Sequence, residues 1–180
     1  MTRYAALLRG MNVGKHRRAS SAQLCDAFRS AGFTGVATFR TAGNVVFSSA
    51  MRSEAKIRHL AEAALESALG HDVTVFVRSE RELRALVDGF PFREETGSRG
   101  KPQVVFLLAP LDAAKQRTLA ALATDADRLQ LVGRDICWWP KGSILDTGLD
   151  WNAIAKVVGP TTTRTFGTVE LLAEKLVEER

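Results

Sequence analysis

The strongest candidate for chemistry is the segment 9–15, which reads Arg9-Gly10-Met11-Asn12-Val13-Gly14-Lys15 and lies between an apolar run and a helical pattern. Glycines allow a ligand to approach the backbone closely, and the free N–H groups and dipole of a helix N-terminus attract anions. The segment is not a P-loop, because Gly10 and Gly14 are four residues apart and His16 follows Lys15. The pattern therefore predicts an anion site of another kind. A tight structural loop capped by Asn12 is the alternative.

The distribution of charge supports the same region. The formal net charge is +5, and the first 25 residues contain five bases and no acid, which leaves 20 basic and 20 acidic residues in the rest of the chain. These five bases are Arg3, Arg9, Lys15, Arg17 and Arg18. The excess is thus entirely N-terminal, which favours an anionic partner, although solvated surface bases that aid solubility explain it as well.

Two residues far along the chain are candidates for the same site. Asn44 follows Gly43 in a hairpin turn and could add an amide if the turn lies beside Arg9. Arg164 could donate two N–H groups to a phosphate or carboxylate, or it could pair with an acid such as Glu170. The complete predicted anion site is Arg9, Gly10, Asn12, Gly14, Lys15, Asn44 and Arg164.

Other chemistries find little support. Trp138 and Trp139 are adjacent on an expected strand, so one ring is either exposed for stacking on a base or covered by the other half or a loop. The three histidines are scattered and no CxxC or HxxxH spacing occurs, so no metal site and no cofactor is predicted. No serine or cysteine has an evident base nearby, so no catalytic residue is assigned.

The elements that must position these residues follow from periodicity. Ser20 and Gln23 form a capping box at the start of a helix, and Thr41-Ala42-Gly43-Asn44 supplies hairpin turn chemistry. In the first half we expect strands at 4–8, 36–40, 45–49 and 73–77, and helices at 20–31, 53–69 and about 80–87. The order is βαββαβ with a helix after it.

The second half repeats this order. We expect strands at 103–109, 128–132, 136–139 and 161–166, and helices at 112–123, 151–158 and 168–178. The predicted fold is α+β, with two tandem ferredoxin-like βαββαβ halves, mainly antiparallel sheets and a C-terminal helix. The predicted domains are an N-terminal half at 1–88, an exposed connection at 89–102, and a C-terminal half with the closing helix at 103–180.

Several of these segments carry a family resemblance. Ala5-Ala6-Leu7-Leu8-Arg9-Gly10-Met11-Asn12-Val13-Gly14 and Ala42-Gly43-Asn44-Val45-Val46-Phe47, with weaker matches at Thr161-Thr162-Thr163-Arg164 and Thr168-Val169, resemble the bacterial domain of unknown function 1697 family. The chain departs from the family pattern at Lys15, Thr165 and Asp146-Thr147-Gly148. The resemblance implies a compact α/β fold and brings no activity with it.

We therefore expect a non-catalytic protein that binds a phosphate-bearing ligand, either a nucleotide or single-stranded nucleic acid. The alternatives are a small enzyme of phosphorylated or carboxylated metabolites, in which Asn12 or Asn44 orients the reacting group, and an interaction module that pairs through its edge strands. We expect a cytoplasmic location, because there is no cleavable signal and no apolar run of ~18 residues. Cys25 and Cys137 are expected to be buried small hydrophobes, and the sequence does not indicate an oligomeric state.

Overall fold

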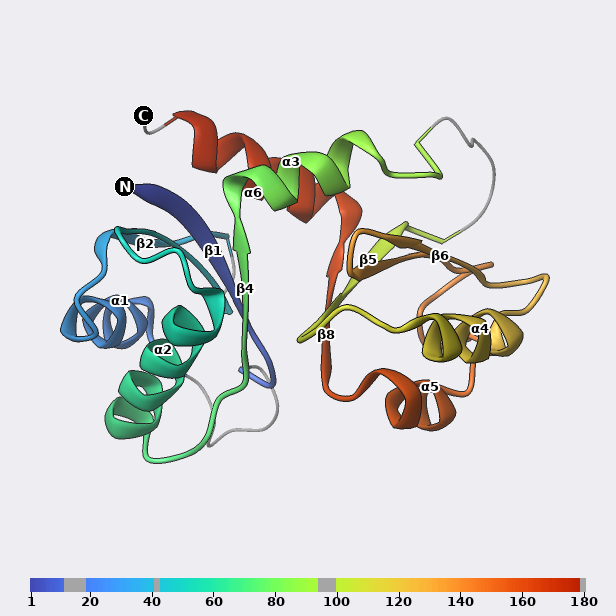
Figure 1. The fold of residues 1–180 in the computed structure, drawn as a ribbon, viewed down its shortest axis with the longest axis horizontal. Helices are drawn as coiled ribbons and strands as arrows, with labels where there is room; N and C mark the ends of the chain where they lie inside the picture. Colours follow the sequence, from blue (N-terminus) through green and yellow to red (C-terminus); the bar gives the residue numbers. More distant parts are fainter. Residues whose placement is uncertain (12–18, 41–42, 94–99, 179–180) are drawn as a thin grey trace. The chain divides into compact units, whose positions relative to one another are not determined.

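The computed structural model describes residues 1–11, 19–40, 43–93 and 100–178 (Figure 1). The first half contains β1 (Thr2–Leu8), α1 (Ser21–Ser30), β2 (Thr34–Thr38), β3 (Asn44–Ser49), α2 (Glu54–Leu69), β4 (Val75–Ser79) and α3 (Glu80–Asp88). The second half contains β5 (Gln103–Leu107), α4 (Ala113–Leu122), β6 (Arg128–Val132), β7 (Asp135–Trp139), α5 (Trp151–Val158), β8 (Thr161–Thr165) and α6 (Phe166–Glu178).

Each half forms a four-stranded sheet of the same topology. The first sheet, called sheet A, has the order β2-β3-β1-β4, and the second, sheet B, has the order β6-β7-β5-β8. Every strand pair is antiparallel. The expected α+β fold of two tandem ferredoxin-like halves is confirmed.

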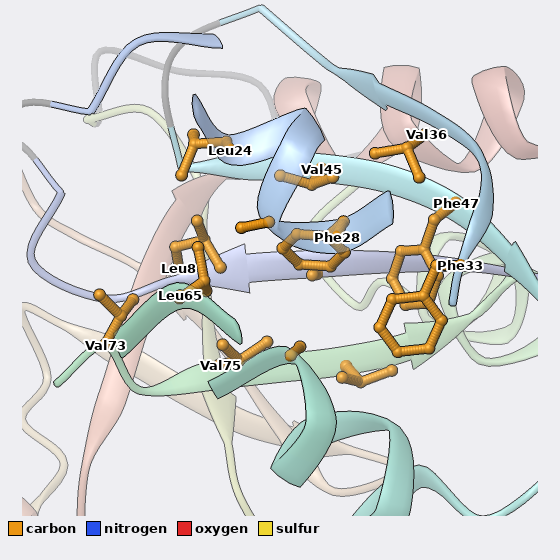
Figure 2. Packing of buried hydrophobic residues seen from close by; sticks show 14 of the residues in the cluster. Leu8, Leu24, Phe28, Phe33, Val36, Val45, Phe47, Leu65, Val73 and Val75 are labelled. Carbon is orange, nitrogen blue, oxygen red and sulfur yellow. The ribbon is translucent and has the colours of Figure 1, made fainter. Parts of the chain in front are cut away.

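The core of the first half lies between sheet A and the helices α1 and α2 (Figure 2). Its centre is Phe47, whose ring centroid lies 4.6 Å from that of Phe33, 5.3 Å from Phe28 and 5.7 Å from Tyr4. Because such aromatic side chains bury the largest apolar areas, this cluster fixes α1 on the sheet. The helix α2 adds Ile57, Ala61 and Leu65 to the same core. The corresponding core of the second half includes Trp138 and Ile154.

Local signals set the helix boundaries. The hydroxyl of Ser20 accepts from the backbone N–H of Gln23, whose side chain accepts from the backbone N–H of Ser20. Both bonds of the predicted capping box are therefore present. In β2 the expected span of 36–40 is shifted toward the N-terminus, and a bulge between Thr34 and Ala37 interrupts its register with β3.

The two halves share an arginine at a matched position of their last strands. Arg78 of β4 lies opposite Ala5 of β1, and Arg164 of β8 lies opposite Val104 of β5. Each arginine donates from Nη1 to the carbonyl of the preceding residue, at 2.7 Å in β4 and 2.8 Å in β8. A helix begins two residues after each arginine, so the structural repeat is βαββαβα rather than βαββαβ.

The chain divides into two compact units, Met1–Leu83 with Leu172–Arg180, and Arg84–Leu171. All three tryptophans lie in the second unit and the single tyrosine lies in the first. The connection 89–102 is not exposed throughout, because Phe90 and Phe92 are buried. Within the described ranges, no helix combines the length and the apolar character that a membrane crossing needs.

Candidate functional site

The described part of the predicted site begins where β1 ends. The Arg9 side chain is exposed, and the backbone N–H of Arg9 donates to the carbonyl of Thr74 at 3.0 Å, which anchors the residue beside the entrance to β4. Gly10 has a φ of 76°, a conformation that L side chains rarely adopt. The predicted residues Asn12, Gly14 and Lys15 lie outside the described ranges.

Gly43 lies beside the end of β1, and the Asn44 side chain is turned back into the hairpin; anion binding by Asn44 stays a prediction. The N–H of Leu8 donates to the carbonyl of Gly43 at 2.7 Å, which joins the turn to the end of β1. The Asn44 side chain is only 1% exposed, and its Nδ2 donates to the carbonyl of Phe39 at 3.3 Å. Asn44 therefore closes the turn between β2 and β3, in agreement with the turn interpretation of Gly43-Asn44.

A further arginine, which sequence reasoning did not assign to the site, lies at this end of sheet A. Arg40 is exposed and has a φ of 59°. The sequence pattern placed it in a strand, but β2 ends at Thr38 and the chain turns at Arg40. Its position immediately before the Thr-Ala-Gly-Asn turn was the available signal. Within the described part of the chain, neither Arg9 nor Arg40 has a hydrogen bond or ion pair from its guanidinium.

Arg164 belongs to the second unit, whereas Arg9 and Asn44 belong to the first. Its Nη1 donates to Thr162 Oγ1 at 2.9 Å and to the Thr163 carbonyl at 2.8 Å. Burial lowers the pKa of Arg164 to about 10, because desolvation disfavours the charged form. The acid considered as its partner, Glu170, has a carboxylate oxygen 3.5 Å from Nη2 of Arg93. Anion binding by Arg164 stays a prediction.

The two adjacent tryptophans are both buried, at 3% and 5% exposure, so of the two interpretations the exposed ring for base stacking is wrong. Trp138 faces the core of its half and donates from Nε1 to Asp127 Oδ1 at 3.1 Å. Trp139 donates from Nε1 to the carbonyl of Gly100 at 3.0 Å, and its ring centroid lies 5.8 Å from that of Phe92. The connection after α3 thus covers the outer ring, as the alternative interpretation held.

A cavity of about 310 Å³ lies beside the end of β1. Its lining residues are His59, Glu62, Ala63, Glu66, Asp72, Val73 and Thr74. Sequence reasoning missed it, although the positions 59, 62 and 66 share one face of α2. Glu62 Oε1 accepts from the N–H of Val75 at 3.0 Å, so part of this acidic lining supports the entry to β4. In the described ranges no cluster of three or more metal-ligating side chains occurs.

Comparisons with known proteins agree with this architecture. The family described as "Protein of unknown function (DUF1697)" matches residues 1–137. A similar solved structure is "The structure of conserved bacterial protein SP0830 from Streptococcus pneumoniae", with 22% identity, a TM-score of 0.79 and 98% of each chain covered, a likeness that shows the fold alone. A comparison with curated proteins gives no match. Because the family match spans well over half of its length, the chain belongs to the DUF1697 family of proteins of unknown function.

Proposed function

We propose that this protein binds a phosphate-bearing ligand, a nucleotide or single-stranded nucleic acid, at the Arg9 end of sheet A, without catalysing a reaction. The observation that carries the proposal is the exposed Arg9 guanidinium, which has no ion pair within the described residues and follows a buried strand whose end is fixed by two backbone hydrogen bonds. These bonds fix the backbone position from which the Arg9 side chain extends. The left-handed Gly10 beside it keeps the backbone free of a side chain.

The chemistry of arginine supports a phosphate. A guanidinium can donate two parallel N–H groups to one phosphate, and these charge-assisted bonds are about twice as strong as neutral ones. The N-terminal excess of bases adds a favourable potential around this loop. Arg9 is therefore expected to contribute to affinity directly, and the surrounding charge to the rate of association.

Thermal unfolding at low salt tests the proposal, with phosphate, nucleotides, sugar phosphates and short oligonucleotides as ligands. A ligand present at about ten times its Kd stabilises the folded state by about 1.4 kcal/mol, which raises Tm by roughly 3–6 °C for a chain of this size. We expect a phosphate-bearing ligand to give this shift with the wild-type protein and not with Arg9→Ala.

Arg52→Ala is the matched control. Arg52 is also exposed, and it follows the other end of β3, so its replacement removes the same charge away from the proposed site. The control should keep the ligand-induced shift. Equal shifts in the wild type and Arg9→Ala, or no shift with any phosphate-bearing ligand, would show that Arg9 and Gly10 serve only the loop.

The second candidate is an enzyme acting on phosphorylated or carboxylated metabolites. One observation favours it, namely the cavity lined by His59, Glu62, Glu66 and Asp72. This cavity places groups capable of general acid–base chemistry next to Thr74, whose carbonyl accepts from the backbone N–H of Arg9. Turnover of a phosphorylated or carboxylated metabolite that is lost in His59→Gln would support it. A broad metabolite screen without product would count against it.

A further inference from the structure

The backbone of Arg40 has a conformation that an arginine rarely adopts. Its φ of 59° lies in the left-handed region, and it is the one non-glycine with positive φ in the described ranges. Glycine populates this region without a steric cost, whereas other residues persist there only when their surroundings impose it. A long charged side chain in a strained turn position, exposed to solvent, suggests that the side chain itself has a use.

The surroundings that impose this conformation are a closed hairpin end. The N–H of Phe39 donates to the carbonyl of Asn44 at 2.9 Å, and the Asn44 amide donates back to the carbonyl of Phe39. Arg40 is the next residue, so the chain must leave the strand there. The bond from Leu8 to Gly43 then holds the turn against β1, directly before Arg9.

Arg9 and Arg40 therefore lie at the same end of sheet A, on either side of the start of β3. Two strand spacings separate their backbones by about 10 Å. The acidic cavity lies on the far side of Arg9, next to β4, and not between the two arginines. Neither guanidinium has an ion pair within the described residues, and the carboxylates described at this end of the sheet belong to the cavity beside β4.

We propose that Arg40 is a second phosphate-contacting residue, and that the ligand carries two neighbouring phosphate groups, one for each arginine. This inference rests on the proposed function. Each guanidinium can donate two N–H groups to its own phosphate, and the backbone separation of about 10 Å leaves room for two phosphate groups side by side between the two arginines. Two neighbouring phosphates occur in a nucleoside diphosphate and in consecutive nucleotides of a single strand.

Titration calorimetry distinguishes a nucleotide ligand from a nucleic acid and tests whether each arginine contacts its own phosphate. The ligands are inorganic phosphate, pyrophosphate, ADP and a short oligothymidylate, and the proteins are the wild type, Arg9→Ala, Arg40→Gly and the control Arg52→Ala. We expect the two-phosphate ligands to bind at least about tenfold tighter than phosphate, and Arg40→Gly to weaken them about tenfold. If the source is nucleic acid, the oligonucleotide binds more tightly than ADP, and each lost arginine reduces the slope of log K against log salt by about 0.7.

Replacing Arg40 with glycine distinguishes an effect on ligand binding from an effect on folding. Glycine adopts a φ of 59° without steric strain, so Arg40→Gly should unfold at the same temperature as the wild type or higher. Its affinity for the two-phosphate ligands should fall. Wild-type affinity in Arg40→Gly, together with lost binding in Arg9→Ala, would overturn this inference and leave the proposed function intact. Equal affinities for phosphate and pyrophosphate would also overturn it. No binding of any of the four ligands would refute both.

Discussion

Replacing Asn44 with alanine distinguishes a structural role for this residue from a role in ligand binding. The side chain is buried and donates one hydrogen bond to the Phe39 carbonyl, so the variant leaves this acceptor without its amide donor. An acceptor left unsatisfied in this way costs about 1–3 kcal/mol. For a chain of this length the expected fall in Tm is about 2–12 °C. Asn44→Asp keeps the size but lacks the N–H donor, so it should be destabilised in the same direction.

The assay is thermal unfolding followed by two probes. Far-UV circular dichroism reports both units, whereas tryptophan fluorescence reports only the second, because Trp138, Trp139 and Trp151 all lie there. The control is Asn152→Ala, which changes an exposed helical asparagine of the second unit and should alter stability by less than about 0.5 kcal/mol. An Asn44→Ala protein with unchanged Tm and lost ligand binding would refute the turn-closing role.

Three further predictions concern packing and the cysteines. Phe47→Ala should cost about 3–5 kcal/mol, since it empties the centre of the aromatic cluster, and urea unfolding measures this loss. Gly100→Ala should destabilise the second unit and change its tryptophan fluorescence, because the added methyl group would overlap the backbone carbonyl of Gly142. Burial, with a smaller contribution from a nearby aspartate, raises the pKa of the Cys137 thiol from 9.0 to about 12, so iodoacetamide should modify the half-buried Cys25 first. The same raised pKa means that the unfolded chain loses this proton first, so Cys137 reduces stability as pH rises above about 9.

The sequence predicted those features that depend on neighbouring residues. The bonds between Ser20 and Gln23 are local. The apolar periodicity that predicted α2 and β6 is also local, and the observed bounds of both elements agree with the predicted ones to within one residue. The ferredoxin-like order followed from these elements, because sequential elements tend to be neighbours and connections do not cross, which leaves few possible topologies. The compact α/β fold that the family resemblance implied agrees with this order.

The remaining features depend on contacts between distant segments. Nothing near Trp139 in the sequence shows that Phe92 and Gly100 cover its ring. The Thr-Ala-Gly-Asn segment predicted the turn after Arg40, but it predicted neither the left-handed backbone of Arg40 nor the bond from Leu8 that joins the turn to β1. The repeated arginine was missed because only the strand register shows that Arg78 and Arg164 are at equivalent positions, and the segments Val75–Ser79 and Thr161–Thr165 share no other identical residue. The acidic cavity joins a helix face to the entrance of a strand, and only the fold brings these together.

Chemical-shift mapping during a titration with pyrophosphate tests the location of the anion site most directly. We expect the largest backbone amide shifts at Arg9, Gly10 and Gly43, a shift of the Arg9 side-chain Nε–H signal with them, and the loss of these changes in Arg9→Ala. Shifts confined to the second unit around Arg164, or to the cavity at His59, would contradict it. An unchanged spectrum at saturating pyrophosphate would contradict it as well.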